Sequence, residues 1–206
     1  MNIRLTANAG VLIDLDGLRI LLDGVCEATE YYLGTPDDIK GELVENLPDA
    51  VGFTHRHSDH FDEDYANLYN SKTLRPILGS ECSRLEVDNV KLTAIPTRHL
   101  GKSDALHFSF IIEGSRRIVF MGDASPSELS KLSAFSSPDL IIVPFAFLNT
   151  EATFKKLKAF GAKEIVAVHM PDPENDPYGI WEMVKNTTKD ENVRHFSKIG
   201  DTITLQ

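Results

Sequence analysis

The chain has 206 residues, of which 42% are hydrophobic and 25% are charged, as in ordinary soluble globular proteins. Its formal net charge of −10 argues against a nucleic-acid partner, because phosphate binding needs clustered Lys and Arg. Only two cysteines occur, Cys26 and Cys82, and they form no CxxC motif. Neither a disulfide framework nor a thiolate metal site is therefore indicated.

The N-terminal sequence MNIRLTANAG has no apolar core of the kind found in secretion signals, and no apolar run approaches the roughly 18 residues of a membrane span. We therefore expect a cytoplasmic protein that has no membrane partner. A chain of this length is expected to form one domain over residues 1–206. The sequence indicates no oligomeric state.

The N-terminal region is predicted to begin with strands over residues 3–7, 11–15 and 18–22. Between the last two, Asp16-Gly17 indicates a two-residue hairpin, because Gly tolerates the positive φ of a type I′ turn. Asp23 ends the third strand. It is explained equally well as a turn residue or as a support for a nearby metal ligand.

A loop and a helix are expected next. Residues 26–33 show no clear period and are expected to form a loop over an active site. Thr35 fits a helix N-cap, with Pro36 at the first helical position. Apolar residues then recur at a four-residue interval from Ile39, which predicts an amphipathic helix.

The most informative stretch is HRHSDH at residues 55–60, which follows a short apolar strand predicted over residues 49–53. Alternate side chains of an extended segment face the same way, so His55 and His57 are expected to project together. The chain then turns and brings Asp59 and His60 to a neighbouring position. Imidazoles and a carboxylate are good ligands for divalent zinc, iron or manganese, so the motif predicts a metal site.

Beyond this motif, further strands and helices alternate. Strands are predicted over residues 74–78, 90–96, 106–112, 116–121, 139–144, 164–168, 193–196 and 202–205. Helices are predicted over residues 62–69, 150–160 and 178–186, with Thr150 and Gly161 at the two ends of the second. Ser80 and Ser125 are expected to cap shorter helical turns. This order of elements indicates an α/β or α+β protein with mixed sheets.

The HxHxDH motif resembles that of the metallo-β-lactamase superfamily. Three downstream residues stand where that family keeps its remaining ligands, each just after a predicted strand: His99, Asp123 and His169. Asp123 is not needed as a helix cap, because Ser125 is better placed for that role. The resemblance spans nearly the whole chain and implies an αββα sandwich, in which two mixed β-sheets pack face to face between helices.

The resemblance also implies a ligand set for two divalent ions. One ion would be held by His55, His57 and His99, and the second by Asp59, His60 and His169, with Asp123 bridging them. Zinc is the expected metal, with manganese and iron as alternatives. Asp123 would fix the separation of the two ions, and Asp59 would anchor the second ion and hydrogen-bond the bridging water, so both are candidate catalytic residues.

The expected activity is hydrolysis of an ester, lactone or related bond of a small molecule by a metal-bridged hydroxide. Two alternatives stay open. A phosphodiesterase or nuclease of the same fold is disfavoured by the acidity of the chain. A metal-bound binding protein without catalysis is disfavoured by the complete ligand set.

Several polar residues near the motifs are assigned lesser roles. Arg56 and Arg98 are expected to point away from the metals, into solvent or an ion pair. Lys102 lies in a Gly-containing loop after His99 and is a candidate contact for an anionic substrate group. His107 and His195 are not part of the ligand set. The remaining candidates for pocket walls are Tyr31, Tyr32 and Tyr178.

Overall fold

The first β-sheet is built on the hairpin that Asp16 and Gly17 close. In this computed structural model, which describes residues 1–101, 106–189 and 193–206, these two residues have φ of 54° and 84°, as a type I′ turn requires. The sheet has the strand order β12-β1-β2-β3-β4. Its strands are β1 (Asn2–Leu5), β2 (Val11–Leu15), β3 (Leu18–Leu22), β4 (Ala50–Gly52) and β12 (Thr202–Thr204). Only the β3–β4 pair is parallel, so the sheet is mixed.

The second sheet has the order β11-β10-β9-β8-β7-β6-β5. Its strands are β5 (Arg84–Val87), β6 (Val90–Thr97), β7 (His107–Glu113), β8 (Arg117–Phe120), β9 (Leu140–Pro144), β10 (Glu164–Val168) and β11 (Val193–His195). Strands β8 to β11 pair in parallel, and β5 to β8 pair antiparallel. Since β6, β8 and β10 all run in the same direction, their carboxyl ends lie at one edge of the sheet.

Side-chain alternation along the strands divides the core into layers. Val11 and Ile13 of β2 pack between the two sheets, whereas Leu12 packs on the opposite face with the helices. In β9, Ile142 belongs to the central layer and Ile141 to the layer beneath the other helices. Inner strands such as β9 therefore bury both faces, which explains why β9 reads as an uninterrupted apolar run.

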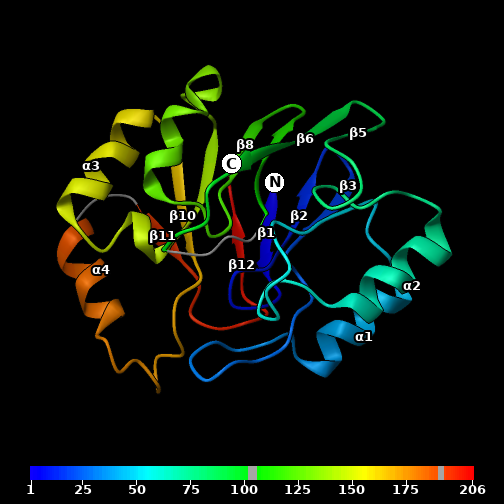
Figure 1. Cartoon of the computed structure of the whole chain (residues 1–206), viewed down its shortest axis with the longest axis horizontal. Coiled ribbons are helices and arrows are strands. Elements are labelled where there is room, and N and C mark those ends of the chain that lie inside the picture. The colour runs from blue at the N-terminus through cyan, green and yellow to red at the C-terminus, as the bar shows by residue number, and fades with distance from the viewer. Residues whose placement is uncertain (102–105, 190–192) are drawn as a thin grey trace.

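Helices cover the outer faces. The α-helices are α1 (Asp37–Glu45), α2 (Glu63–Thr73), α3 (Glu151–Phe160) and α4 (Ile180–Thr188), and the short 3₁₀ helices span Pro126–Ser130, Ser133–Phe135 and Phe145–Phe147. Figure 1 shows α1 and α2 on one side of the molecule and α3 and α4 on the other, with the sheets between them. This is the predicted αββα sandwich, and the expectation of fold class is confirmed.

The predicted ends of α3 are also confirmed. The Thr150 side chain accepts a hydrogen bond from the Thr153 backbone N–H, and Gly161 ends the helix in the left-handed region with φ of 81°. Thr35, by contrast, does not cap α1. Its hydroxyl accepts a hydrogen bond from Cys26 N and donates one to Gly24 O, and α1 begins after Pro36 without a side-chain cap.

The region after α2 differs from the sequence-based expectation. The strand predicted over residues 74–78 is absent from the described structure, because α2 extends to Thr73 and Leu74 takes a left-handed conformation with φ of 57°. Ser80 lies in a turn and caps no helix. Strand β5 was not predicted; it pairs with β6 through a turn at Asp88, whose φ is 50°.

Within the described residues, no helix has the length and apolar character needed to cross a membrane.

Gly41 tests the conformational cost of glycine inside α1. A Cβ at Gly41 would have nothing within 4 Å, so Gly41→Ala removes chain entropy from the unfolded state without a clash. We expect the free energy of unfolding, measured by urea denaturation, to rise by about 0.5–1 kcal/mol. The matched variant is Gly17→Ala, where space is equally open but φ is +84°, so stability should fall instead. An equal effect of the two substitutions would contradict this explanation.

Candidate metal centre

The site forms where four segments leave the carboxyl ends of strands. Residues 55–60 follow β4, His99 follows β6, Asp123 follows β8 and His169 follows β10. Backbone hydrogen bonds fix these segments to one another. Leu100 N donates to Asp123 O (2.7 Å), and His169 N donates to Asn8 O (2.8 Å) in the turn after β1.

The side chains form three overlapping groups whose potential ligand atoms lie within 4.8 Å of one another. These groups are His55–His57–His99, His55–His60–Asp123 and Asp59–His60–His169. The structure thus brings together all seven residues that the sequence singled out. Their role as metal ligands stays a prediction, but their convergence is a fact of the fold.

Asp123 lies between the groups. Its Oδ1 is 3.5 Å from His60 Nε2, and its Oδ2 is 3.6 Å from His99 Nε2 and 3.4 Å from His169 Nε2. Asp59 faces only one side of the site, with Oδ2 3.5 Å from His169 Nε2. At the other side, His55 Nε2 and His57 Nδ1 are 2.9 Å apart. Two imidazoles on one tetrahedral zinc would be separated by a similar distance, roughly 3.3 Å for bonds of about 2.0–2.1 Å.

A second layer of hydrogen bonds sets the proton positions on the histidines. Asp23 Oδ2 accepts hydrogen bonds from Thr54 Oγ1 (2.6 Å) and His60 Nδ1 (2.8 Å), and Oδ1 accepts from Thr54 N (2.7 Å). Because its hydroxyl hydrogen is given to Asp23, Thr54 Oγ1 accepts from His55 Nδ1 (3.0 Å). His99 Nδ1 likewise donates to Leu100 O (2.5 Å). Such outer partners leave Nε2 free and fix the ring orientation of metal-binding histidines.

Orphaned polar atoms show that these residues fit a divalent ion. Among the described residues, His60 Nε2, His99 Nε2, His169 Nε2 and Asp123 Oδ1 are buried without a hydrogen-bond partner. Buried polar atoms are rarely left unpaired, because each one costs about 1–3 kcal/mol. A cation among them would satisfy all four. The donor set of imidazole nitrogens and carboxylate oxygens is one that zinc accepts.

The electrostatics of the site also favour positive charge. Burial alone would lower the pKa of His169, but Asp123 and Asp59 outweigh it and raise the pKa to about 9. Burial has the opposite effect on a carboxyl group and would raise the pKa of Asp123. His169 and His60 nevertheless hold this pKa well below its ordinary value. For His60, Asp123 and Asp23 overcome burial and raise the pKa well above its usual range. Protons thus occupy the site in the absence of metal, and a divalent ion would displace them.

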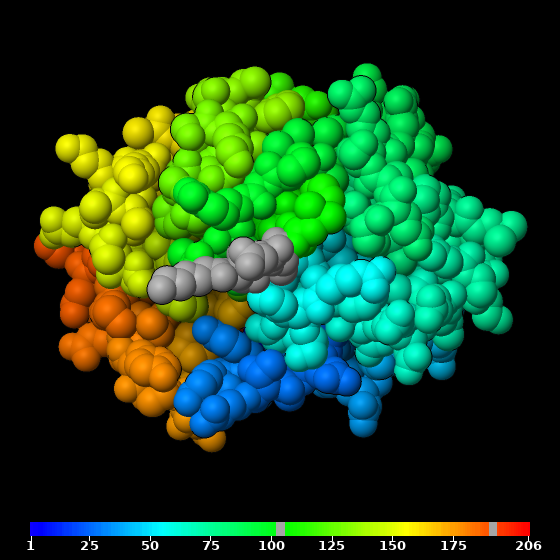
Figure 2. Space-filling model, in the orientation of Figure 1, coloured from blue at the N-terminus to red at the C-terminus, as the bar shows by residue number. Residues whose placement is uncertain are grey.

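A loop that was expected to cover the site does border it. Glu27 N donates to Ser58 O, and Asp172 N donates to Tyr31 O, so residues 26–34 lie between two other segments. Figure 2 shows this blue segment beside the cyan residues after β4 and the orange residues after β10.

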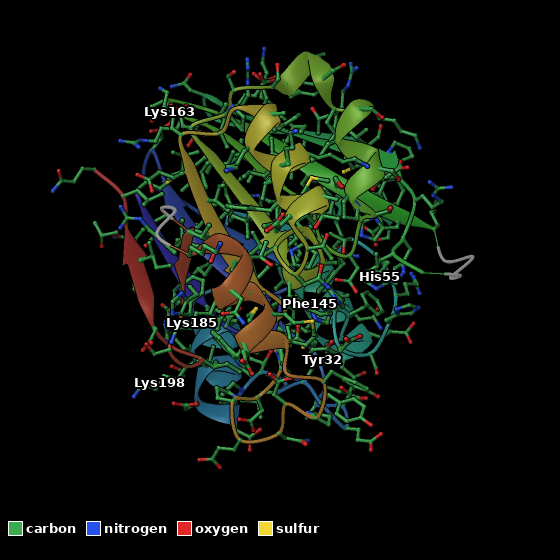
Figure 3. All side chains as sticks on the ribbon, turned by 90° about the vertical axis from the view of Figure 1, so that its left-hand side faces the viewer. Tyr32, His55, Phe145, Lys163, Lys185 and Lys198 are labelled. Carbon is green, nitrogen blue, oxygen red and sulfur yellow. The ribbon has the colours of Figure 1, made fainter. Side chains whose placement is uncertain are left out.

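Tyr32 forms part of the wall, with its ring centroid 4.2 Å from that of His169. Phe145 approaches His169 at 6.3 Å, and Figure 3 shows Tyr32, Phe145 and His55 in the same part of the molecule. Tyr31 and Tyr178 instead pack edge to face against each other at 5.8 Å. Burial, Asp123 and Asp59 raise the pKa of Tyr32 to about 12, which keeps its hydroxyl neutral.

Sequence reasoning undervalued His107. This residue is buried, and its ring centroid lies 5.2 Å from His55 and 5.7 Å from His99. Its Nδ1 bonds to Thr97 Oγ1 at 2.8 Å, and burial lowers its pKa to about 3, so it stays neutral. The only sequence signal was a histidine in an apolar strand, which does not reveal the register that places Thr97 opposite His107.

The other polar candidates lie away from the ligand groups. The Arg56 guanidinium stacks 4.8 Å from the Phe61 ring centroid, and Arg98 contacts Ser127 and Glu128. His195 packs against Trp181 with centroids 5.7 Å apart. Lys102, the candidate for contact with an anionic substrate group, lies outside the described residues.

Comparison with known proteins connects this geometry to a family. Residues 2–169 match the family described as Beta-lactamase superfamily domain, which confirms the resemblance inferred from the HxHxDH motif. No match was found among curated protein sequences.

Solved structures share the fold over their full length. The isothiocyanate hydrolase from Delia radicum gut bacteria is 17% identical, with 100% of this chain and 99% of that chain covered and a TM-score of 0.66. A possible metal-dependent hydrolase from Veillonella parvula is 17% identical, with 99% and 98% covered and a TM-score of 0.69. A metallo-beta-lactamase fold protein from Bacillus subtilis is 16% identical, with 98% and 99% covered and a TM-score of 0.60. At these identities the likeness is one of fold.

Asp23→Asn tests whether the hydrogen bonds from Thr54 and His60 to Asp23 support the candidate metal ligands. Asparagine is as large as aspartate and tolerates the left-handed backbone of this position (φ 48°). It lacks the negative charge that accepts hydrogen bonds from Thr54 and His60. We expect metal affinity, measured by competition with a chromophoric chelator, to fall about 10–100-fold. Asp88→Asn is the matched control, because Asp88 is exposed and has φ of 50°. Unchanged affinity in Asp23→Asn would show that Asp23 does not support the ligands.

Proposed function

The chain belongs to the beta-lactamase superfamily, a family of metal-dependent hydrolases, and on this premise we propose that it is a dinuclear enzyme that cleaves an ester, lactone or related bond of a small molecule. The observation that carries the proposal is the position of Asp123, whose two oxygens face His60, His99 and His169 from within 3.6 Å. A carboxylate that faces two groups of ligands is suited to a position between two ions.

The proposed ligand sets follow the geometric groups. Two of the three groups supply these sets: His55, His57 and His99 would hold one ion, and Asp59, His60 and His169 the other. Asp123, whose oxygens face His60, His99 and His169, would be common to both. Zinc suits this set best, and manganese or iron would also accept it. Such ions supply a Lewis acid and a water whose pKa falls from about 15.7 to roughly 7.

The chain itself positions the reactants. Asp59 is partly exposed at the site and can accept a hydrogen bond from the attacking water, which orients it. Thr54 and Asp23 keep His55 and His60 in one orientation, so the site needs little rearrangement during the reaction. Tyr32 covers His169 and limits the access of bulk water from that side.

A substrate panel tests the reaction class. The metal-loaded protein would be assayed against model carboxylic esters, lactones and phosphodiesters. We expect turnover of esters or lactones. Activity on phosphodiesters alone would favour the phosphodiesterase alternative, and activity on none, with metal bound, would favour a binding protein.

The ligand count predicts metal content. We expect elemental analysis of protein purified without chelator to give about two divalent ions per chain, because seven donors exceed the four of a single tetrahedral site. A content at or below one ion after reconstitution with excess metal would reject the dinuclear proposal.

His57→Ala and Asp59→Asn should differ in kind. His57→Ala removes a ligand of the first ion and should weaken that ion and abolish turnover. Asp59→Asn should keep the fold and one ion but lose most activity, because the second group loses the carboxylate that it does not share with the first. Circular dichroism, metal content and kcat would be measured together.

His195→Ala serves as the control, because His195 is exposed and packs on Trp181 outside the site. Turnover by Asp59→Asn within a few-fold of the unmodified protein would refute the proposed role of Asp59.

A further inference from the structure

An apolar cavity of about 280 Å³ adjoins one side of the metal centre. His55 and His57 form part of its wall, so the cavity borders the first group of candidate ligands. The apolar part of its wall is formed by Phe53, Phe61, Leu106 and Phe108, and the wall also contains Thr54, Arg56 and Ser80. None of these apolar residues was singled out as a site residue by its sequence pattern.

The fold holds this wall in place. Phe53 is buried and packs edge to face against Phe61, with centroids 4.9 Å apart. Phe108 N donates a hydrogen bond to Thr54 O (2.9 Å), which joins the start of β7 to the segment that carries the histidines. Leu106 is 69% exposed at the edge of the cavity, where an apolar ligand could cover it.

Acidic residues lie in a cleft next to the cavity. Arg56 and Phe61 line both the cavity and a second cleft, which is also lined by four carboxylate residues. These residues are Glu27, Asp62, Glu63 and Asp64. Arg56 would attract a negatively charged substituent in the cavity and these carboxylates would repel it, so the two effects oppose each other, whereas the packing of an uncharged group depends on neither.

We propose that this cavity is the subsite for the substrate group attached to the cleaved bond, and that it takes an uncharged alkyl or aryl group. At about 30 Å³ per displaced water, its volume admits roughly nine non-hydrogen atoms. The reactive carbonyl would then lie beside His55 and His57, with its apolar substituent against Leu106 and Phe108. The inference rests on the proposed hydrolase function for the reaction, but the apolar preference follows from the cavity alone.

The first test is kinetic. With the metal-loaded protein, kcat/KM for p-nitrophenyl acetate, butyrate and hexanoate should rise with chain length, by up to about fourfold per methylene. Leu106→Glu should reduce the hexanoate-to-acetate ratio at least tenfold, because it places a charge at the edge of the cavity. Leu74→Glu is the matched control, since Leu74 is 87% exposed at the end of α2 and should leave the ratio unchanged.

A binding measurement separates the cavity from catalysis. Titration calorimetry would compare acetate, hexanoate and adipate, whose tail matches that of hexanoate but ends in a second carboxylate. Hexanoate should bind at least tenfold more tightly than acetate and adipate, and Leu106→Glu should remove the difference between hexanoate and acetate. This result without ester turnover would support the subsite and count against the hydrolase proposal. Ester turnover without any chain-length preference, together with equal binding of hexanoate and acetate, would overturn the subsite and leave the hydrolase proposal standing.

Discussion

The buried carboxylate of Asp23 is the constraint on which the site depends. Its side chain is fully buried, and an unpaired charge in that position would cost several kcal/mol, so the three hydrogen bonds from Thr54 and His60 are obligatory. They join the end of β3 to the segment after β4 and orient His55 through Thr54. Gly122 makes room for this arrangement, because a Cβ there would lie 2.6 Å from Thr54 Cγ2.

The site therefore pairs negatively charged carboxylates with histidines that carry protons, around a position that suits cations. Asp59 and Asp123 stay ionised beside His60 and His169, which retain protons that burial alone would remove. Both sides of this cluster have apolar neighbours, Tyr32 on one and the cavity beside His57 on the other. Low local polarity strengthens each electrostatic contact in the cluster, which is what a preorganised reaction site requires.

Sequence patterns succeeded where the deciding interactions are local. The Asp16-Gly17 hairpin and the ends of α3 at Thr150 and Gly161 depend on residues only a few positions apart, and both were predicted correctly. The prediction of a strand over residues 74–78 was wrong, because the end of the preceding helix was misplaced. The apolar residues of this segment fit a strand pattern. Helix α2, however, continues further than its apolar period suggested, and Leu74 ends the helix in a left-handed conformation.

The sequence by itself determined the family and the chemical types of the site residues, because HxHxDH, His99, Asp123 and His169 each follow a recognisable strand. Only the tertiary structure decided that Asp123 lies between His99 on one side and His60 and His169 on the other, and that Asp23 supports the histidines. It also decided that Leu106 and Phe108 form an apolar wall beside His57. The reason is physical: these contacts join residues far apart in the chain, and sheet register and side-chain packing, which no local spacing encodes, set their distances.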